Sequence, residues 1–437
     1  MAISQRYQIA HLLRRAGFGA TVAELDQYNK LGFEGAVDRL LDFGSVPDPA
    51  EEGATRQGFD LAKSDGIRQW WLYRMFRTTR PLQEKLTLFW HGHFAVSNAK
   101  VNNPVWMRAQ NELFRRNAAG SFRDLVQAVA KNPAMLRWLD SATNRKRAPN
   151  ENFARELMEL FCLGIGNYTE ADVKEAARAF TGWEIRGDSF YFNPNEHDDG
   201  DKTVLGRTGN LGGEAVIDHV VARPAAARFL AGKLFRFFVY DDPEPAVIDR
   251  LARVYTASGY SIKAVMREIL LAPEFRSDRA YRAKIKSPIE LTIGALKDTG
   301  VYAIPRNLNL ASWTRSMGQD LFYPPTVKGW DGGRTWLTAA TLVTRCNFLS
   351  RLLSGSENNQ RYVKPDVLLG EAGISGDDTL GVINLFAERF VEADAKPALA
   401  TDLEAFVGEA LANRALRDRS TRAIMHLIMA SPSYQAA

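Results

Sequence analysis

The amino-acid sequence predicts a mainly α-helical protein: a bundle-like assembly of many helices with a small β-hairpin or long structured loop near residues 183–206. Apolar residues recur at helical spacing along most of the chain, which is the pattern of amphipathic helices. Only one short segment is rich in residues that favour strands. Strand and helix nowhere alternate as they do in a dinucleotide-binding fold, so that class is excluded.

The first helix is indicated by Ile9, Leu12 and Leu13, which share one apolar face, and by Gly17, which closes the segment. The same spacing predicts further helices, in chain order, at 21–30, 33–42, 65–78, 81–91, 102–117, 121–131, 151–163, 170–182, 224–237, 244–257, 261–271, 287–298, 336–353, 380–391, 399–411 and 414–430.

The strand-like segment runs from Trp183 to Phe192 and precedes a polar loop and a short return at 203–206. Residues 354–378 mix Gly, Ser, Asn and Asp and are expected to form an exposed connection. We treat 1–437 as one unit that divides into an N-terminal helical region, 1–206, with the candidate site, and a C-terminal helical region, 207–437.

An internal similarity links residues 264–275 with residues 423–434. Each segment is an amphipathic helix stopped by proline and followed by an aromatic residue, Phe275 or Tyr434. We expect both rings to be buried against the preceding helix and to close two comparable helical units.

The composition, with 46% hydrophobic and 24% charged residues, is that of a globular protein and excludes disorder over the whole chain. The formal net charge of +5 is small for 437 residues, and the short basic cluster at 144–147 reads as a loop, so no nucleic-acid partner is expected. Two cysteines cannot form a disulfide framework. The start lacks the features of a signal peptide and no run of about 18 apolar residues occurs, so we expect a cytoplasmic protein without a membrane span, with export alongside a partner left open.

Several motifs of known chemistry are absent from the sequence. It has no phosphate loop of the G-x-x-x-x-G-K-[ST] type, no H-E-x-x-H, no C-x-x-C and no G-x-S-x-G. A candidate site must therefore come from other segments.

The first candidate is the sequence WHGHF at 90–94. Two histidines one residue apart can bind one metal from an extended backbone, whereas in a helix they would point about 200° apart. Gly92 suggests that the helix ends or bends between His91 and His93, which would allow metal or acid–base chemistry. The alternative is a histidine that caps the helix or satisfies a buried polar group.

The second candidate is a predicted helix face that begins at residue 150. It carries Asn150, Glu151, Asn152, Arg155, Glu156 and Glu159 opposite an apolar face. Pairs between Arg155 and Glu151 or Glu159 at helical spacing would suit a solvated face. Three carboxylates and an amide would also suit a metal or a general acid–base pair, provided that other parts of the chain cover the face. We expect Asn152 and Glu156 to be buried.

The third candidate is the polar loop 195–202, which includes His197. Its oxygen ligands could hold a hard cation, although the spacing departs from the EF-hand pattern and a plain exposed turn fits equally well.

The fourth candidate is the segment 323–336, in which two prolines and three glycines surround two tryptophans. Prolines fix an extended entry and glycines permit unusual backbone angles. The segment reads as a rigid loop, either a structural clamp or a wall that faces a ligand.

Together these segments resemble the bacterial domain-of-unknown-function 1800 family. The resemblance rests on HLLRRAGFG at 11–19, WHGHF at 90–94, NENFARELMELFCLGIGNYTEADVKEAARAFTGW at 150–183, the PP-x-V-x-GW-x-GG-x-x-W pattern at 324–336 and the closing ASPSYQ. It covers nearly the whole chain.

The resemblance implies a mostly helical bacterial protein, often encoded beside a second family that commonly bears export signals; such a co-encoded protein is the expected partner. It implies no known activity, substrate or cofactor. The histidine, asparagine and glutamate positions that mark the family fall on His91, His93, Asn150, Glu151, Asn152, Arg155 and Glu156, and Tyr168, Glu170 and Asp172 belong to the same block.

Our hypothesis from the sequence is a metal-assisted or acid–base enzyme, a hydrolase or oxidoreductase. Its catalytic residues would be His91, His93, Glu156 and Arg155, and a divalent metal would be held by His91, His93, Glu156 and Glu159. At least one imidazole should then lie within about 4–5 Å of a carboxylate from the 151–159 face. The alternative is a non-catalytic scaffold or partner-binding protein in which the same polar residues lock helices together.

Overall fold

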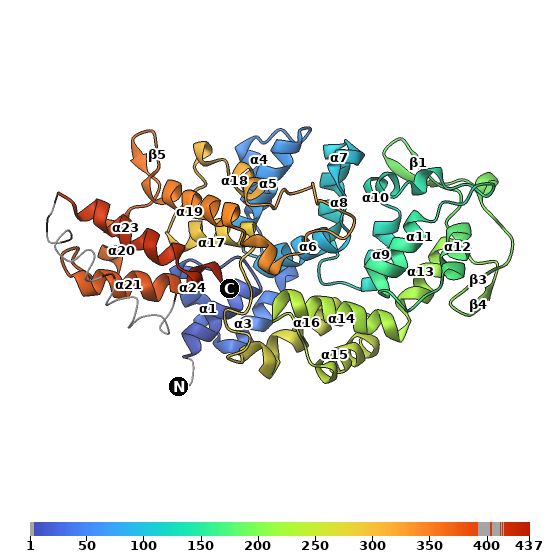
Figure 1. Ribbon diagram of the computed structural model, residues 1–437, viewed down its shortest axis with the longest axis horizontal. Helices are drawn as coiled ribbons and strands as arrows, with labels where there is room; N and C mark the ends of the chain where they lie inside the picture. Colours follow the sequence, from blue (N-terminus) through green and yellow to red (C-terminus); the bar gives the residue numbers. More distant parts are fainter. Residues whose placement is uncertain (1–3, 392–402, 404–410, 412, 414) are drawn as a thin grey trace.

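The computed structural model describes residues 4–391, 403, 411, 413 and 415–437. These residues are mainly helical, with three two-stranded antiparallel sheets, which confirms the predicted fold class (Figure 1). None of the described helices is long and apolar enough to cross a membrane.

The first part of the chain forms α1 (Gln5–Arg15), α2 (Val22–Asn29), α3 (Gly32–Leu41), α4 (Ala50–Gln57), α5 (Ser64–Arg77), α6 (Pro81–His93), α7 (Asn98–Val101), α8 (Pro104–Arg116), α9 (Phe122–Ala130), α10 (Pro133–Trp138), α11 (Asn152–Glu156) and α12 (Glu170–Ala179). The second part forms α13 (Gly213–Val221), α14 (Pro224–Phe238), α15 (Pro245–Ala257), α16 (Ile262–Leu271), α17 (Pro288–Asp298), α18 (Leu310–Ser316), α19 (Ala339–Ser354), α20 (Pro365–Glu371), α21 (Thr379–Val391), α23 (Arg417–Ala430) and α24 (Pro432–Gln435).

The predicted hairpin is present as β1 (Trp183–Arg186) and β2 (Ser189–Phe192), with Trp183 opposite Phe192. The polar loop after it leads into a second hairpin, β3 (Lys202–Val204) and β4 (Arg207–Gly209). Figure 1 shows these strands with α9–α13 at one end of the molecule, α19, α20, α21 and α23 at the other, and α6, α14 and α16 between them.

Two predicted segments differ from the structure. The helix expected at 151–163 divides into α11 and a π-helical turn, η3 (Leu157–Cys162). The connection at 354–378 is not a plain exposed loop, because it contains the hairpin β5 (Ser356–Glu357) and β6 (Gln360–Arg361) and the helix α20, in which Leu368 and Leu369 are buried. The helix expected at 399–411 falls almost entirely outside the described residues.

Phe275 and Tyr434 are both fully buried, as predicted. Each follows a helix and a proline, in η5 (Pro273–Arg276) and α24. Their rings contact other helices. The ring centroid of Phe275 lies 4.9 Å from that of His11 in α1, and the ring centroid of Tyr434 lies 6.0 Å from that of Phe390 in α21. These aromatic residues therefore join neighbouring helices into one core.

Candidate functional site

Helix α6 positions the two histidines of the WHGHF motif. The helix begins with Pro81 at its first position and continues through Gly92 to His93, so the expected break at Gly92 is wrong. Because each helical residue turns about 100°, the two rings point about 200° apart. His91 and His93 therefore enter different environments.

His91 supports the loop that follows α18. Its Nε2 accepts the main-chain N–H of Phe322 at 3.1 Å. Phe322 has a φ of 66°, an unfavourable angle for a bulky residue. Burial lowers the pKa of His91 to about 3, so the ring is neutral and keeps its acceptor. This histidine satisfies a buried polar group, the structural alternative stated above.

His93 is held by the end of the 150–163 segment. Its Nε2 lies 3.0 Å from the carbonyl oxygen of Phe161, and because a carbonyl only accepts, Nε2 carries the proton. The other nitrogen, Nδ1, is buried and has no hydrogen-bond partner among the described residues. Burial, and secondarily the charge of Lys233, holds the pKa of His93 well below its usual range.

The polar face of 150–163 is only partly covered. Asn152 is exposed, against the prediction, and Glu156 is half-buried. Burial raises the pKa of Glu156, and the charge of Glu159 adds to the effect. The Glu159 carboxylate accepts from the hydroxyl of Tyr168 at 2.9 Å.

Arg155 connects α11 to α12 at the surface. It pairs with Glu151 at 2.9 Å and with Glu170 at 2.7 Å, and the Glu170 side chain is 67% exposed. Exposed pairs of this kind contribute little to stability. Within the same block Asn150 accepts from the main-chain N–H of Asn152, and Asp172 forms a capping box at the start of α12.

The loop 195–202 is organised by main-chain contacts and by one arginine. His197 is buried, and its Nδ1 lies 2.9 Å from the carbonyl oxygen of Thr181. Asp198 pairs with Arg178 at 2.7 Å. In the part of the chain that the structure describes, no group of three or more His, Cys, Asp or Glu residues is arranged to hold a metal ion. The predicted ligand set of His91, His93, Glu156 and Glu159 is therefore not brought together.

His93 instead lines a cavity of 520 Å³, which we call the central pocket. Its walls come from the ends of α1 and α6, from α14, from residues 284–290 and from the loop 328–336. Four aromatic side chains contribute to the walls: Phe89, Phe237, Trp330 and Trp336.

The central pocket has an excess of positive charge. Lys328 pairs with Asp331 at 2.8 Å and Lys284 pairs with Asp241. Among the described residues no carboxylate lies within ion-pair distance of four further cations that line it, Arg15, Lys233, Arg236 and Arg334.

Most of these cations are fixed by main-chain carbonyls. Arg15 donates through Nε to Phe238 at 3.0 Å, and Lys233 donates to Leu160 at 3.1 Å. Arg236 donates to the carbonyl of Asp241 at 3.1 Å. Carbonyl contacts orient the cations without neutralising them, so the charges remain available to a ligand.

The π-helical turn η3 supplies two of the supporting carbonyls. The N–H of Leu163 reaches back five residues to Met158 at 2.8 Å. The carbonyl oxygens of Leu160 and Phe161 accept instead from Lys233 and His93. The 150–163 segment thus contributes to the pocket through its main chain and not through its polar face.

The loop 323–336 packs directly on the end of α6. Gly329 has a φ of 87°, and a Cβ at this position would lie 2.5 Å from the carbonyl oxygen of Gly92. Trp330 and Trp336 face the pocket beside this contact. The loop is therefore a clamp on the end of α6 and a wall of the cavity, and that this wall faces a ligand stays a prediction.

Sequence reasoning missed the cations of the central pocket. Arg15 and Arg334 lie inside segments that carried the family resemblance, which is a signal that could have identified them. Lys233 and Arg236 stand in an ordinary amphipathic helix, where nothing local distinguishes them from solvated residues.

The comparisons with known proteins give one result. The model of the family described as "Protein of unknown function (DUF1800)" matches residues 11–436. Neither the curated proteins nor the solved structures include a significant match. Since the match extends over nearly the entire sequence, the chain belongs to the DUF1800 family.

Proposed function

We propose that this protein is an acid–base enzyme that acts on a small anionic molecule with an apolar part, bound in the central pocket. The observation that carries the proposal is the set of four cations around a cavity of 520 Å³ for which the described residues provide no carboxylate partner.

The pocket suits a ligand that combines negative charge with an apolar body. Small-molecule sites are typically concave and mostly apolar, with a few charged groups that fix the orientation of the ligand. Here Arg15 and Arg236 would bind acidic groups by charge-assisted hydrogen bonds. The rings of Trp330 and Trp336 would contact the apolar part.

Lys233 is the candidate base. Burial is the main cause that lowers its pKa to about 8, with a smaller contribution from the charge of Lys328. An amine with this pKa is partly neutral near physiological pH and can accept a proton from a bound substrate. His93, which presents an unprotonated Nδ1, is the candidate hydrogen-bond acceptor that would orient a substrate hydroxyl or amine.

The rival function is a scaffold that binds another protein, such as the co-encoded partner expected from the family resemblance. The salt bridges of Arg155 and the His91–Phe322 contact favour it, because both connect elements of the fold. A scaffold does not need the volume of the central pocket, so filling that volume separates the two functions.

Gly92 allows the pocket to be filled without disturbing the core. It lies within helix α6 and lines the pocket, and a Cβ at this position would meet nothing within 4 Å. Gly370 in α20 is the matched control, since it is also helical and equally open but lines none of the pockets described.

The experiment is a thermal-shift and turnover screen of small carboxylates and phosphate esters against the wild type, Gly92→Met and Gly370→Met. We expect ligands that stabilise the wild type and Gly370→Met but not Gly92→Met. Lys233→Arg should keep binding, because Arg15 and Arg236 are unchanged, and lose turnover, because a guanidinium does not release its proton. Equal stabilisation of all variants, or binding with no turnover of any ligand, would refute the enzyme.

A further inference from the structure

We propose that a second cavity, on the face formed by α4, α5, α6 and α8, is a separate binding site for a phosphate-type dianion. It has a volume of 420 Å³, and we call it the arginine hollow. It shares no lining residue with the central pocket, and five arginines and three carboxylates line it.

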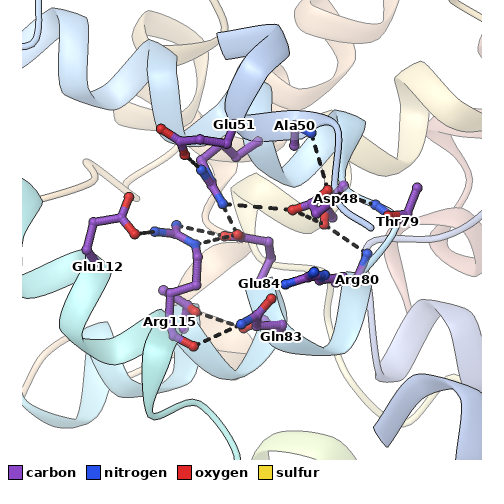
Figure 2. Close-up of polar contacts among 12 residues, drawn as sticks. Asp48, Ala50, Glu51, Thr79, Arg80, Gln83, Glu84, Glu112 and Arg115 are labelled. Carbon is purple, nitrogen blue, oxygen red and sulfur yellow. Dashed lines mark hydrogen bonds and ion pairs between the residues drawn. The ribbon is translucent and has the colours of Figure 1, made fainter. Parts of the chain in front are cut away.

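The base of the hollow is a buried ion-pair network. Glu84 is fully buried and accepts from Arg115 at 2.5 and 3.0 Å, from Trp71 at 2.9 Å and from Arg74 at 3.5 Å. Figure 2 shows Arg115 lying between Glu84 and Glu112. Arg74 and Arg115 are 5% and 4% exposed, so the network fixes their guanidinium groups beneath the opening.

The carboxylates of the hollow are already engaged. Glu112 pairs with Arg115 at 3.1 Å, and Glu51 pairs with Arg74. Asp48 accepts from the main-chain N–H groups of Ala50 and Thr79 at 3.3 and 3.2 Å. Together with Glu84, these acids more than neutralise Arg74 and Arg115, so an anionic ligand must be held by other cations at the opening.

Three further arginines remain at the hollow without a carboxylate within ion-pair distance among the described residues. The Arg80 side chain donates only through Nε to the carbonyl of Val46, and neither the Arg108 nor the Arg116 side chain makes a polar contact within the described residues. Guanidinium groups match the oxygen geometry of phosphate and bind it with two hydrogen bonds each. Three of them around one cavity favour a dianion over a singly charged ligand.

The test is calorimetric titration of the full-length protein at constant ionic strength with phenyl phosphate, inorganic phosphate and sulfate. The first two probes distinguish an organic phosphate ester from the free ion as the preferred ligand. We expect Arg108→Gln/Arg116→Gln to weaken phosphate binding at least about tenfold, since one charge-assisted hydrogen bond is worth about 1.5–3 kcal/mol. Neither side chain supports the fold, so the double variant should unfold at the wild-type temperature.

Two controls make the result specific. Arg253→Gln removes an exposed helical arginine far from the hollow in sequence, and it should bind like the wild type. Gly92→Met should also bind like the wild type, which separates this site from the central pocket. Affinity for phenyl phosphate should rise between pH 5 and 7, because its second pKa is about 6, while affinity for sulfate stays constant.

Three calorimetric results would contradict the second site. No binding to the wild type, or equal binding to the double variant, would overturn the proposal. Loss of binding only in Gly92→Met would assign the anion to the central pocket, which would support the proposed function and refute the second site.

Discussion

The Nε2 atom of His91 accepts the main-chain N–H of Phe322 at 3.1 Å, and through this bond the WHGHF motif holds the loop that walls the central pocket. Replacing the ring by His91→Phe would leave this N–H buried without a partner. We expect a loss of about 1–3 kcal/mol in the free energy of unfolding, measured by urea denaturation. His91→Gln, which keeps an acceptor, should recover part of the loss; equal stability of wild type and His91→Phe would contradict the assigned role.

Acid should destabilise the fold through buried histidines. Burial lowers the pKa of His11, His91 and His93, to about 3 for His91. Below the unfolded pKa of about 6.5 the unfolded chain binds protons that the folded chain does not, so stability falls as the pH drops from about 6.5 toward 3. Each histidine adds up to about 1.4 kcal/mol per pH unit. His91→Gln should reduce this slope in denaturation curves at pH 4–7; an unchanged slope would argue against a neutral buried ring.

Substitution of Glu84 should lower the free energy of unfolding more than substitution of a carboxylate at the rim of the hollow. Burial alone would raise its pKa, but Arg115 and Arg74 outweigh burial and hold the pKa below its usual range. Glu84→Gln would leave two buried guanidinium groups without their counter-charge, at an expected cost of about 3–5 kcal/mol. Glu112→Gln at the rim is the control and should cost less than about 1 kcal/mol. Similar losses of stability in Glu84→Gln and Glu112→Gln would contradict the central role of Glu84 in the network.

Gly329 should not tolerate a side chain. Its φ of 87° and the 2.5 Å approach to the Gly92 carbonyl both oppose a Cβ. Gly329→Ala should lower the free energy of unfolding by at least about 1–3 kcal/mol and weaken ligands of the central pocket. In Gly370→Ala, a helical and open position, stability should stay the same or rise by up to about 1 kcal/mol. The readout is the melting temperature of both variants.

Activity should depend on the ionisation of Lys233. As a base it must be neutral, and its pKa of about 8 means that kcat/KM for a substrate of the central pocket should rise with pH and level off above about 8. Lys233→Arg should remove this rise. A profile that falls through the same range would show that the protonated amine is the active form.

Most of the longer helices and the first hairpin could be predicted because their signals are local, whereas α4, α10, α13, α18 and α20 were missed. The apolar face of Ile9, Leu12 and Leu13 and the β-favouring residues after Trp183 determine secondary structure within a few positions. The division of 150–163 could not be predicted, because the π-helical turn is stabilised by Lys233 and His93, which contact it from distant parts of the chain.

The candidate site could be predicted only in part, because most of its contacts join residues that are distant in the chain. His93 was identified, but its partner is a main-chain carbonyl, and carbonyls carry no signature in a sequence. The polar residues around Arg155 carried the clearest motif, yet they form pairs at the surface. The cations of α14 belong to the pocket because the loop 323–336 lines the same cavity, although the two segments lie about 90 positions apart in the chain.

The wide turn Leu157–Cys162 has a consequence for reading the sequences of related proteins. A π-helical turn contains one residue more than the α-helix that it interrupts, so its length is part of the architecture of the pocket. A relative that is one residue shorter between Phe153 and Gly164 would rotate the carbonyls of Leu160 and Phe161 by about 100° away from Lys233 and His93. A deletion placed after Glu159 would leave the polar residues of 150–159 unchanged while removing both supports, and it would mark a branch with altered chemistry.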